Sequence, residues 1–175
     1  MTEYKAMTEE DLKGLYAFAA PIWKECYQGV LPEGQIDLLT HKYFDYANIL
    51  SFRQAGMIYE SISYEGKPAG FLAFRLHEDF TYLDKIYLKQ EFRGKHISSE
   101  TFESLLQRYR KPLRLNVNQG NKLGMRAYQG QGFRIVEEKR YDLPNGYVNC
   151  DYIMEKPLPE EIKPPASADT ILTAD

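Results

Sequence analysis

Cysteine is scarce in this chain, which has only Cys26 and Cys150 among its 175 residues. Two cysteines form no disulfide framework and favour a reducing compartment. No apolar run approaches the roughly 18–20 residues of a membrane span, and no charged-then-apolar leader opens the chain. We therefore expect a cytoplasmic protein with no membrane partner.

A large charge of either sign is also missing, since the net charge is −3. A mildly acidic chain offers no basic surface for DNA or RNA, so no nucleic-acid partner is expected. The sequence predicts no metal site either. Tyrosine, by contrast, is abundant at 14 residues. Its rings suit partly exposed packing surfaces, or a site lined with hydroxyl groups.

The spacing of apolar residues predicts one α/β (α+β) domain over residues 1–158. Helices come first, then a meander of three strands, then two strand–helix units, which predicts a mixed sheet with helices on both faces. Residues 159–175 have little to bury, and we expect a disordered tail. Strands are expected at 2–6, 57–64, 69–75, 82–88, 113–117, 133–141 and 147–155, and helices at 9–20, 22–27, 35–54, 97–110 and 121–130.

A basic loop precedes the expected helix at 97–110. The start of a helix collects free backbone amides and the positive end of the helix dipole, which together bind phosphate. Arg93 and Lys95 add positive charge, and Gly94 allows the backbone to approach a ligand closely. Ser98 and Ser99 are expected to cap the helix. An ordinary capped helix behind a basic loop is the alternative interpretation.

Two familiar phosphate motifs do not match this loop. The P-loop pattern fails because Lys89 stands where its first glycine is needed, and His96 stands where its hydroxyl residue is needed. The dinucleotide-binding fingerprint fails because the glycine spacing is absent.

Residues 121–133 form the most informative segment of the chain. Asn121 is expected to open a short helix, and Tyr128 follows seven residues later, two turns along the same face. The helix closes at Gly132, and Phe133 begins the next strand. Taken alone, Asn121 would be a helix cap and Tyr128 a packing residue.

The loop and the helix together resemble the acetyl-CoA-dependent N-acetyltransferases of the GNAT superfamily. The shared patterns are Arg-Gly-Lys-x-Ile-x-Ser before a helix and Asn-x₆-Tyr-x₃-Gly-Phe after the next strand, and the element order agrees over about residues 3–158. The resemblance implies a mostly antiparallel sheet of about seven strands whose central strands splay apart around the cofactor. The residues it implies in acetyl-CoA binding are Ile86, Tyr87, Leu88, Arg93, Gly94, Lys95, His96, Ile97, Ser98, Ser99, Asn121 and Tyr128.

The chain departs from the family pattern in its loop and in its helix. The family prefers Gly where this chain has His96, and Gly or Ala where it has Ser98. His96 would either crowd the pyrophosphate or donate to it when protonated. Gly124 stands where many relatives have Ala, and it weakens the helix slightly.

The resemblance also implies a mechanism in which an amine attacks the acetyl carbonyl directly and Tyr128 protonates the departing thiolate. The amine must first lose a proton, since a lysine-like amine has a pKa of about 10.4. The family's usual Glu is replaced by Tyr82. Asp84 is one candidate base, and Glu25, Tyr27 or a chain of waters are others. Asp84 would otherwise be a surface carboxylate paired with Lys85 or Arg93.

The acceptor is a small-molecule or peptide amine in this interpretation. Trp23, Glu25, Tyr27 and Tyr82 are its candidate contacts, because aromatic and acidic groups embrace a cation. Trp23 would otherwise be a core residue. The first helices and the last strands are somewhat similar to polyamine acetyltransferases. A homodimer is common among such proteins, and no interface can be read from the sequence.

Two other functions stay open at the level of sequence. One is an acyl-CoA-binding sensor that retains the fold without turnover, which the replacements at Tyr82 and His96 would allow. The other is an interaction domain without any ligand, in which the glycine-rich turns are purely structural. Tyr128 favours the enzyme.

Overall fold

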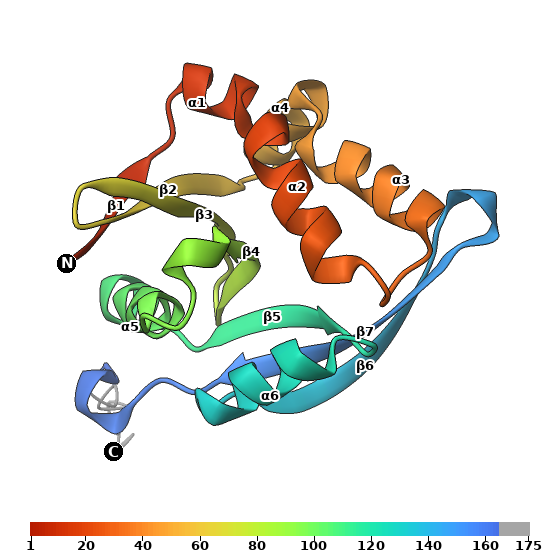
Figure 1. The fold of residues 1–175 in the computed structure, drawn as a ribbon. Helices are drawn as coiled ribbons and strands as arrows, with labels where there is room; N and C mark the ends of the chain where they lie inside the picture. The colour runs from red at the N-terminus through yellow and green to blue at the C-terminus, as the bar shows by residue number, and fades with distance from the viewer. Residues whose placement is uncertain (165–175) are drawn as a thin grey trace, which may run out of the picture.

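A sheet of seven strands in the order β1-β2-β3-β4-β5-β7-β6 crosses the molecule (Figure 1). The structure is a computed structural model that describes residues 1–164. All neighbouring strands are antiparallel except β4 and β5, so the expected fold class is confirmed. The strands are β1 (Thr2–Ala6), β2 (Ile58–Tyr64), β3 (Lys67–Leu76), β4 (Thr81–Leu88), β5 (Leu113–Asn118), β6 (Arg134–Asp142) and β7 (Val148–Lys156), and the helices are α1 (Glu9–Lys13), α2 (Leu15–Tyr27), α3 (Glu33–Phe44), α4 (Tyr46–Gln54), α5 (Ile97–Tyr109) and α6 (Lys122–Gly130).

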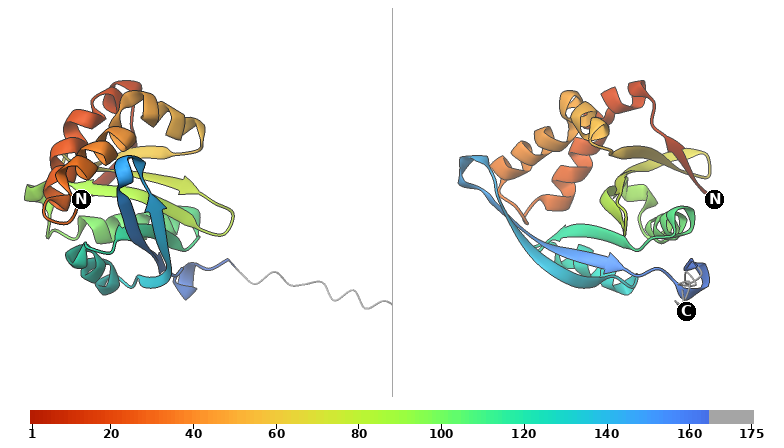
Figure 2. Two further views of the ribbon diagram at one scale, coloured as in Figure 1. Left: turned by 90° about the vertical axis from the view of Figure 1, so that its right-hand side faces the viewer. Right: turned by 180° about the vertical axis from the view of Figure 1, so that it is seen from behind.

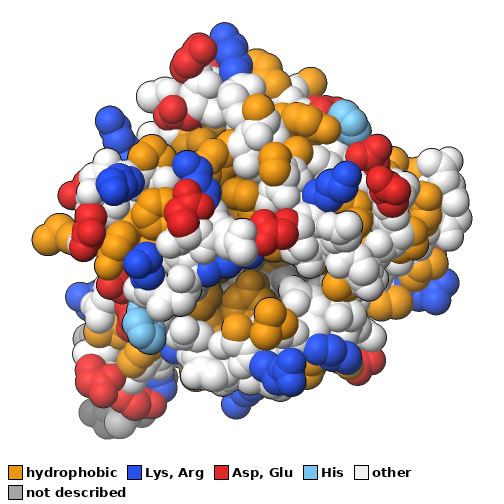
Figure 3. Space-filling view, in the orientation of Figure 1, with side chains coloured by type: hydrophobic (Ala, Val, Ile, Leu, Met, Phe, Trp, Pro, Cys, Tyr) orange, Lys and Arg blue, Asp and Glu red, His pale blue; other side chains and the backbone are white. Residues whose placement is uncertain are grey.

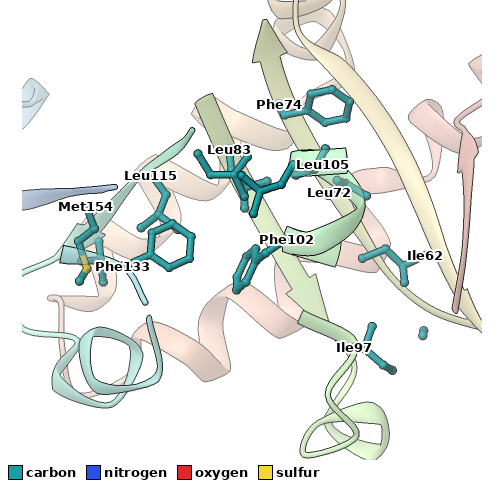
Figure 4. Packing of buried hydrophobic residues seen from close by; sticks show 14 residues of the cluster. Ile62, Leu72, Phe74, Leu83, Ile97, Phe102, Leu105, Leu115, Phe133 and Met154 are labelled. Carbon is teal, nitrogen blue, oxygen red and sulfur yellow. The ribbon is translucent and has the colours of Figure 1, made fainter. Parts of the chain in front are cut away.

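Two hydrophobic clusters cover the two faces of this sheet. Alternate residues of β3 separate them: Phe71 faces α1–α4, whereas Leu72 faces α5. Figure 4 shows Phe102 and Leu105 of α5 packed beside Leu72. The helices α1–α4 gather on one side of the molecule and α5 and α6 on the other (Figure 1). The expected placement of helices on both faces is therefore confirmed.

The first helices begin and end at different residues from those expected. The first helix ends at Gly14, and α2 begins directly after it. Helix α2 continues through Pro21, where we expected a helix to end. Proline lacks one donor but does not always end a helix. Thr8 and Asp11 form a capping box at the start of α1. The single helix expected at 35–54 is two helices, which meet at Asp45.

The parallel strands β4 and β5 pair only at their beginnings. Thr81 lies opposite Leu113 and Tyr82 opposite Arg114, and no further pair joins the two strands. Beyond these pairs the strands diverge, while β5 pairs with β7 along its whole length. The divergence leaves backbone donors and acceptors of β4 residues 83–88 facing the gap without a partner strand.

The hairpin of β6 and β7 leans over the sheet toward α3 (Figure 2). The side-chain amide of Gln35 in α3 donates to the carbonyl of Val148 at 3.2 Å. A Cβ on Gly34 would lie 2.3 Å from the hydroxyl of Tyr147, so a larger residue there would displace the end of the Tyr147 side chain. The contact closes one side of a cavity that is described below.

The chain beyond β7 begins with ordered structure. Residues Glu160–Ile162 form a short 3₁₀ helix, and Leu158 and Ile162 pack against the cluster that α5 covers. Of the disordered tail expected at 159–175, residues 165–175 lie outside the described residues. Within residues 1–164, no helix combines the length and the apolar character needed to cross a membrane.

Candidate active site

A groove occupies the gap between β4 and β5. Its volume is about 440 Å³, and Figure 3 shows a hollow lined by hydrophobic side chains in the middle of this face. The floor comes from the α5 side of the sheet, through Leu83, Phe102 and Leu115. Of the residues expected at the cofactor, those that line this groove are Ile86, Tyr87, Leu88, Arg93, Ser98, Asn121 and Tyr128.

Asn121 and Tyr128 both face the groove from α6, as their spacing of two helical turns requires. The side-chain oxygen of Asn121 accepts a hydrogen bond from the amide of Gly124 at 2.9 Å and so caps the helix. A Cβ on Gly124 would lie 2.4 Å from the Asn121 side chain. Gly124 therefore makes room for the cap, a role beyond the lower helix propensity that the sequence indicated.

The Tyr128 ring is held between two aromatic residues. Its centroid lies 5.6 Å from that of Phe133 and 6.1 Å from that of Phe102. Burial raises the pKa of Tyr128 to about 12, and nearby Cys26 adds to the shift. The phenol therefore keeps its proton at neutral pH and remains available as a donor to a group that develops negative charge in the groove.

The loop before α5 contains two residues with left-handed backbone conformations. Gly94 has a φ of 74° and His96 a φ of 62°, and both lie in the left-handed region. The N-cap residue of α5 is His96, which makes no side-chain cap. The prediction that Ser98 and Ser99 cap the helix is therefore wrong, and both serines lie in its first turn. The left-handed conformation explains why glycine is preferred at the position of His96.

The side chains of this loop divide between two sides of α5. Arg93 and Ser98 face the groove, whereas Ile97 is 1% exposed in the core. His96 and Ser99 instead line a separate shallow pocket beside β1. Only the backbone of Ile97 is thus available to a ligand, while Gly94 and Lys95 are exposed.

Arg93 bridges the mouth of the groove. Its Nε donates to the carbonyl of Leu88 at 3.3 Å, and its Nη1 donates to the carboxylate of Glu25 in α2 at 3.1 Å. The sequence placed Glu25 at the acceptor, but its side chain lines the groove on the side of Arg93. An anion at the start of α5 would compete with Glu25 for this guanidinium.

A second cavity of about 340 Å³ lies on the α2–α3 side of the sheet. Of the expected acceptor contacts, Trp23, Tyr27 and Tyr82 line it. Trp23 is also a core residue, since it is 6% exposed and its ring lies 4.5 Å from that of Tyr27. The residues that line both cavities, and so form their common wall, are Tyr27, Asp84, Lys85, Tyr87 and Asn116.

Asp84 occupies a β-bulge in β4. Phe74 lies opposite Leu83 and Ala73 opposite Lys85, so Asp84 has no partner in β3. The sequence expectation of a regular strand at this point is wrong. The Asp84 carboxylate forms an ion pair with Lys85, and the Lys85 ammonium lies 4.1 Å from the centroid of the Tyr43 ring. Asp84, the first candidate base, therefore already has a cation as its partner.

A polar network that sequence reasoning missed lies at the bottom of the second cavity. The Tyr82 hydroxyl donates to the side-chain oxygen of Asn116 at 2.6 Å, and the side-chain amide of Asn116 donates to the Asp151 carboxylate at 3.1 Å. The Asn149 amide donates to the same carboxylate at 3.0 Å. The alternation of Asn116 with Asn118, and of Asn149 with Asp151, places polar side chains on the same face of each strand, and this was the available signal.

Comparison with known families identifies the family of this chain. The model of the Acetyltransferase (GNAT) family matches residues 17–133, which include β4, the loop, α5 and α6. The chain belongs to the GNAT family. Acetyl-CoA is the cosubstrate of this family, and acetyl transfer is its activity. No protein among the curated ones matches the chain.

Solved GNAT structures share the fold. The chain is similar to the PaiA N-acetyltransferase of Thermoplasma acidophilum, crystallised with coenzyme A, at 23% identity and TM-score 0.69 over 90% of this chain and 99% of that one. A GCN5-related N-acetyltransferase of Rhodopseudomonas palustris gives 16% identity and TM-score 0.72 over 90% and 96%. The ribosomal-protein-S18-alanine N-acetyltransferase of Escherichia coli gives 18% and 0.62 over 90% and 94%. At these identities the likeness extends to the fold.

The groove of this GNAT protein fits acetyl-CoA on three counts. The gap-facing edge of β4 offers unpaired backbone groups to a chain of amides such as pantetheine. The amides that begin α5 lack helical partners and suit phosphate. A Cβ added to Gly94 would meet no atom within 4 Å, so space remains where the loop meets a ligand.

Proposed function

We propose that this protein transfers the acetyl group of acetyl-CoA to a primary amine, with both substrates bound at once. The observation that carries the proposal is the pair of cavities that meet at a common wall. The groove between β4 and β5 takes the acetyl donor, and the polar cavity beside α2 and α3 takes the acceptor. An amine in the second cavity then attacks the acetyl carbonyl directly.

Several residues of the groove have a defined role in this proposal. Backbone groups from Ile86 to Leu88 orient the donor, and an amide there stabilises the developing oxyanion. Arg93 and the start of α5 hold the pyrophosphate. Tyr128, which stays protonated at neutral pH, donates its proton to the sulfur as the C–S bond breaks.

The acceptor in this proposal is a cationic amine on a small molecule or a peptide. Tyrosine rings line the second cavity, and they favour a cation through their faces. The ribosomal-protein acetyltransferase of Escherichia coli illustrates a peptide acceptor within the same fold. Polyamines are a further class that the sequence resemblance raises.

The test is coenzyme A release from acetyl-CoA over a panel of polyamines, amino acids, aminoglycosides and short peptides. We expect one class to give turnover well above the rate without amine. Acetyl-CoA binding is measured by calorimetry alongside. Tight binding with no turnover across the panel would favour an acyl-CoA sensor over an enzyme, and no binding at all would contradict both.

A further inference from the structure

Asp151 of β7 is a buried carboxylate at the bottom of the acceptor cavity. Its side chain lines that cavity although the residue is only 7% exposed. Asn149 donates to one carboxylate oxygen at 3.0 Å and Asn116 donates to the other at 3.1 Å. Each oxygen accepts one hydrogen bond from these neutral amides, so lone pairs remain for a ligand.

Asp151 differs from Glu60, the other buried carboxylate of residues 1–164, in having no cation beside it. Glu60 is paired with Arg108, and the half-buried Asp84 is paired with Lys85. Among the described residues, none of the ion pairs includes Asp151. A buried charge without a counter-ion is unfavourable for folding. A cation that enters the cavity would therefore form a favourable ion pair with the Asp151 carboxylate, because no side chain of the protein does so.

The groups that share the cavity do not supply that cation from within. The Lys85 ammonium is engaged by Asp84 and by the Tyr43 ring. Lys42 is exposed on α3, and its ammonium lies 5.6 Å from the centroid of the Tyr43 ring. The titratable groups that line the cavity with Asp151 are Tyr27 of α2, Lys42 and Tyr43 of α3, Tyr82, Asp84, Lys85 and Tyr87 of β4, and Tyr141 and Asp142 of β6.

Asp151 also lies one hydrogen bond from the cofactor groove. Asn116, which donates to it, lines both cavities. A group bound at Asp151 would therefore be next to the wall through which the two substrates must meet. Burial raises the pKa of the Asp151 carboxyl, although the two asparagine amides oppose the shift. A raised pKa makes this carboxylate a better proton acceptor.

We propose that Asp151 binds the ammonium group of the acceptor and takes a proton from it, so that the acceptor is a primary amine that enters as a cation. The proposal rests on the proposed function. One proton passes from the ammonium to Asp151 and on to solvent. The free amine forms a C–N bond to the acetyl carbon as the C–S bond breaks, Tyr128 protonates the thiolate, and the second proton of the nitrogen restores Tyr128. An ammonium and a thioester thus give an amide, a thiol and one proton.

The experiment compares Asp151→Asn with wild type over pH 6.5–10. General base catalysis is worth on the order of 10²–10⁴-fold, so we expect kcat/KM for the best amine to fall by about 100-fold at pH 7. The deficit should shrink toward pH 10, where more of the amine is neutral in solution. Calorimetry should show unchanged acetyl-CoA affinity, and weaker binding of the amine to the complex with coenzyme A.

Two further variants keep the test decisive. Asp151→Glu retains a carboxylate and should keep activity within about tenfold of wild type, in line with an acid–base role. Glu138→Gln removes the same charge from the exposed face of β6, outside both cavities, and should change neither measurement. A deficit below threefold for Asp151→Asn, or the same deficit at every pH, would overturn the proposal. An inactive wild type would instead count against the proposed function itself.

Discussion

At the scale of single residues, the site depends on groups whose surroundings fix their protonation. Tyr128 is kept neutral by burial against Phe102 and Phe133. Asp84 forms an ion pair with Lys85, whereas the Asp151 carboxylate accepts hydrogen bonds from two neutral amides. One acid and one unmatched carboxylate, on opposite sides of a common wall, are what an exchange of protons between two substrates requires.

Tyr128→Phe should lower kcat by about 100-fold, because the variant lacks only the hydroxyl that protonates the thiolate. The ring still packs on Phe133, so the affinity for acetyl-CoA should stay within about threefold, as calorimetry would show. Because the pKa of Tyr128 is about 12, its ionisation should cause no loss of wild-type activity below pH 10. Tyr109→Phe on α5, outside both cavities, is the matched control. Equal rates for Tyr128→Phe and wild type would remove Tyr128 from the mechanism.

His96→Gly should stabilise the protein. His96 has a φ of 62°, a conformation that costs most residues roughly 1–2 kcal/mol and costs glycine little. Part of the gain is lost to the flexibility of glycine in the unfolded chain, so we expect about 0.5–1 kcal/mol. That corresponds to a rise in Tm of about 1–4 °C in a domain of this size. A Tm that is unchanged or lower would contradict the strain we infer.

At the scale of elements, the shape of β4 largely determines the shape of the site. Its bulge at Asp84 and its divergence from β5 leave one edge open to a ligand, while β3 holds the other edge. Gly70 of β3 permits this pairing: a Cβ there would lie 2.1 Å from the carbonyl oxygen of Tyr87 and 3.1 Å from the Cα of Leu88. The absence of a side chain at Gly70 thus allows β3 to hold β4 in place at the residues expected to contact acetyl-CoA.

Gly70→Ala should therefore destabilise the fold by about 2 kcal/mol or more, because the clash is with backbone that cannot move aside alone. Acetyl-CoA affinity should fall as well, since Tyr87 and Leu88 shift. Denaturant unfolding and calorimetry measure the two effects. Gly130→Ala is the control, because its added Cβ would meet nothing within 4 Å. A Gly70→Ala variant as stable as wild type would contradict this account of β4.

The elements also show which features a sequence pattern is able to predict. Gly94 and Asn121 report local backbone demands, so the loop before α5 and the cap of α6 were predictable from a few neighbouring residues. The second cavity was not, because Asn116 and Asp151 are 35 residues apart and meet through strand register. The bulge at Asp84 depends on pairing with β3, which no local pattern specifies.

At the scale of the whole molecule, one sheet separates the two cavities, which meet at their common wall. Helices α1–α4 and the β6–β7 hairpin enclose the acceptor side, and α5 and α6 enclose the donor side (Figures 1 and 2). The splay of β4 from β5 is the passage between them. The central claim is that acetyl-CoA occupies this passage.

Amide hydrogen exchange with and without acetyl-CoA tests that claim most directly. We predict slower exchange at β4 residues 83–88, whose gap-facing groups would gain partners, and at residues 97–99 in the first turn of α5. Exchange in β1 and β2, which lie at one edge of the sheet away from the gap, should not change. Unaltered exchange at 83–88, or protection confined to the pocket beside β1 that His96 and Ser99 line, would contradict the account.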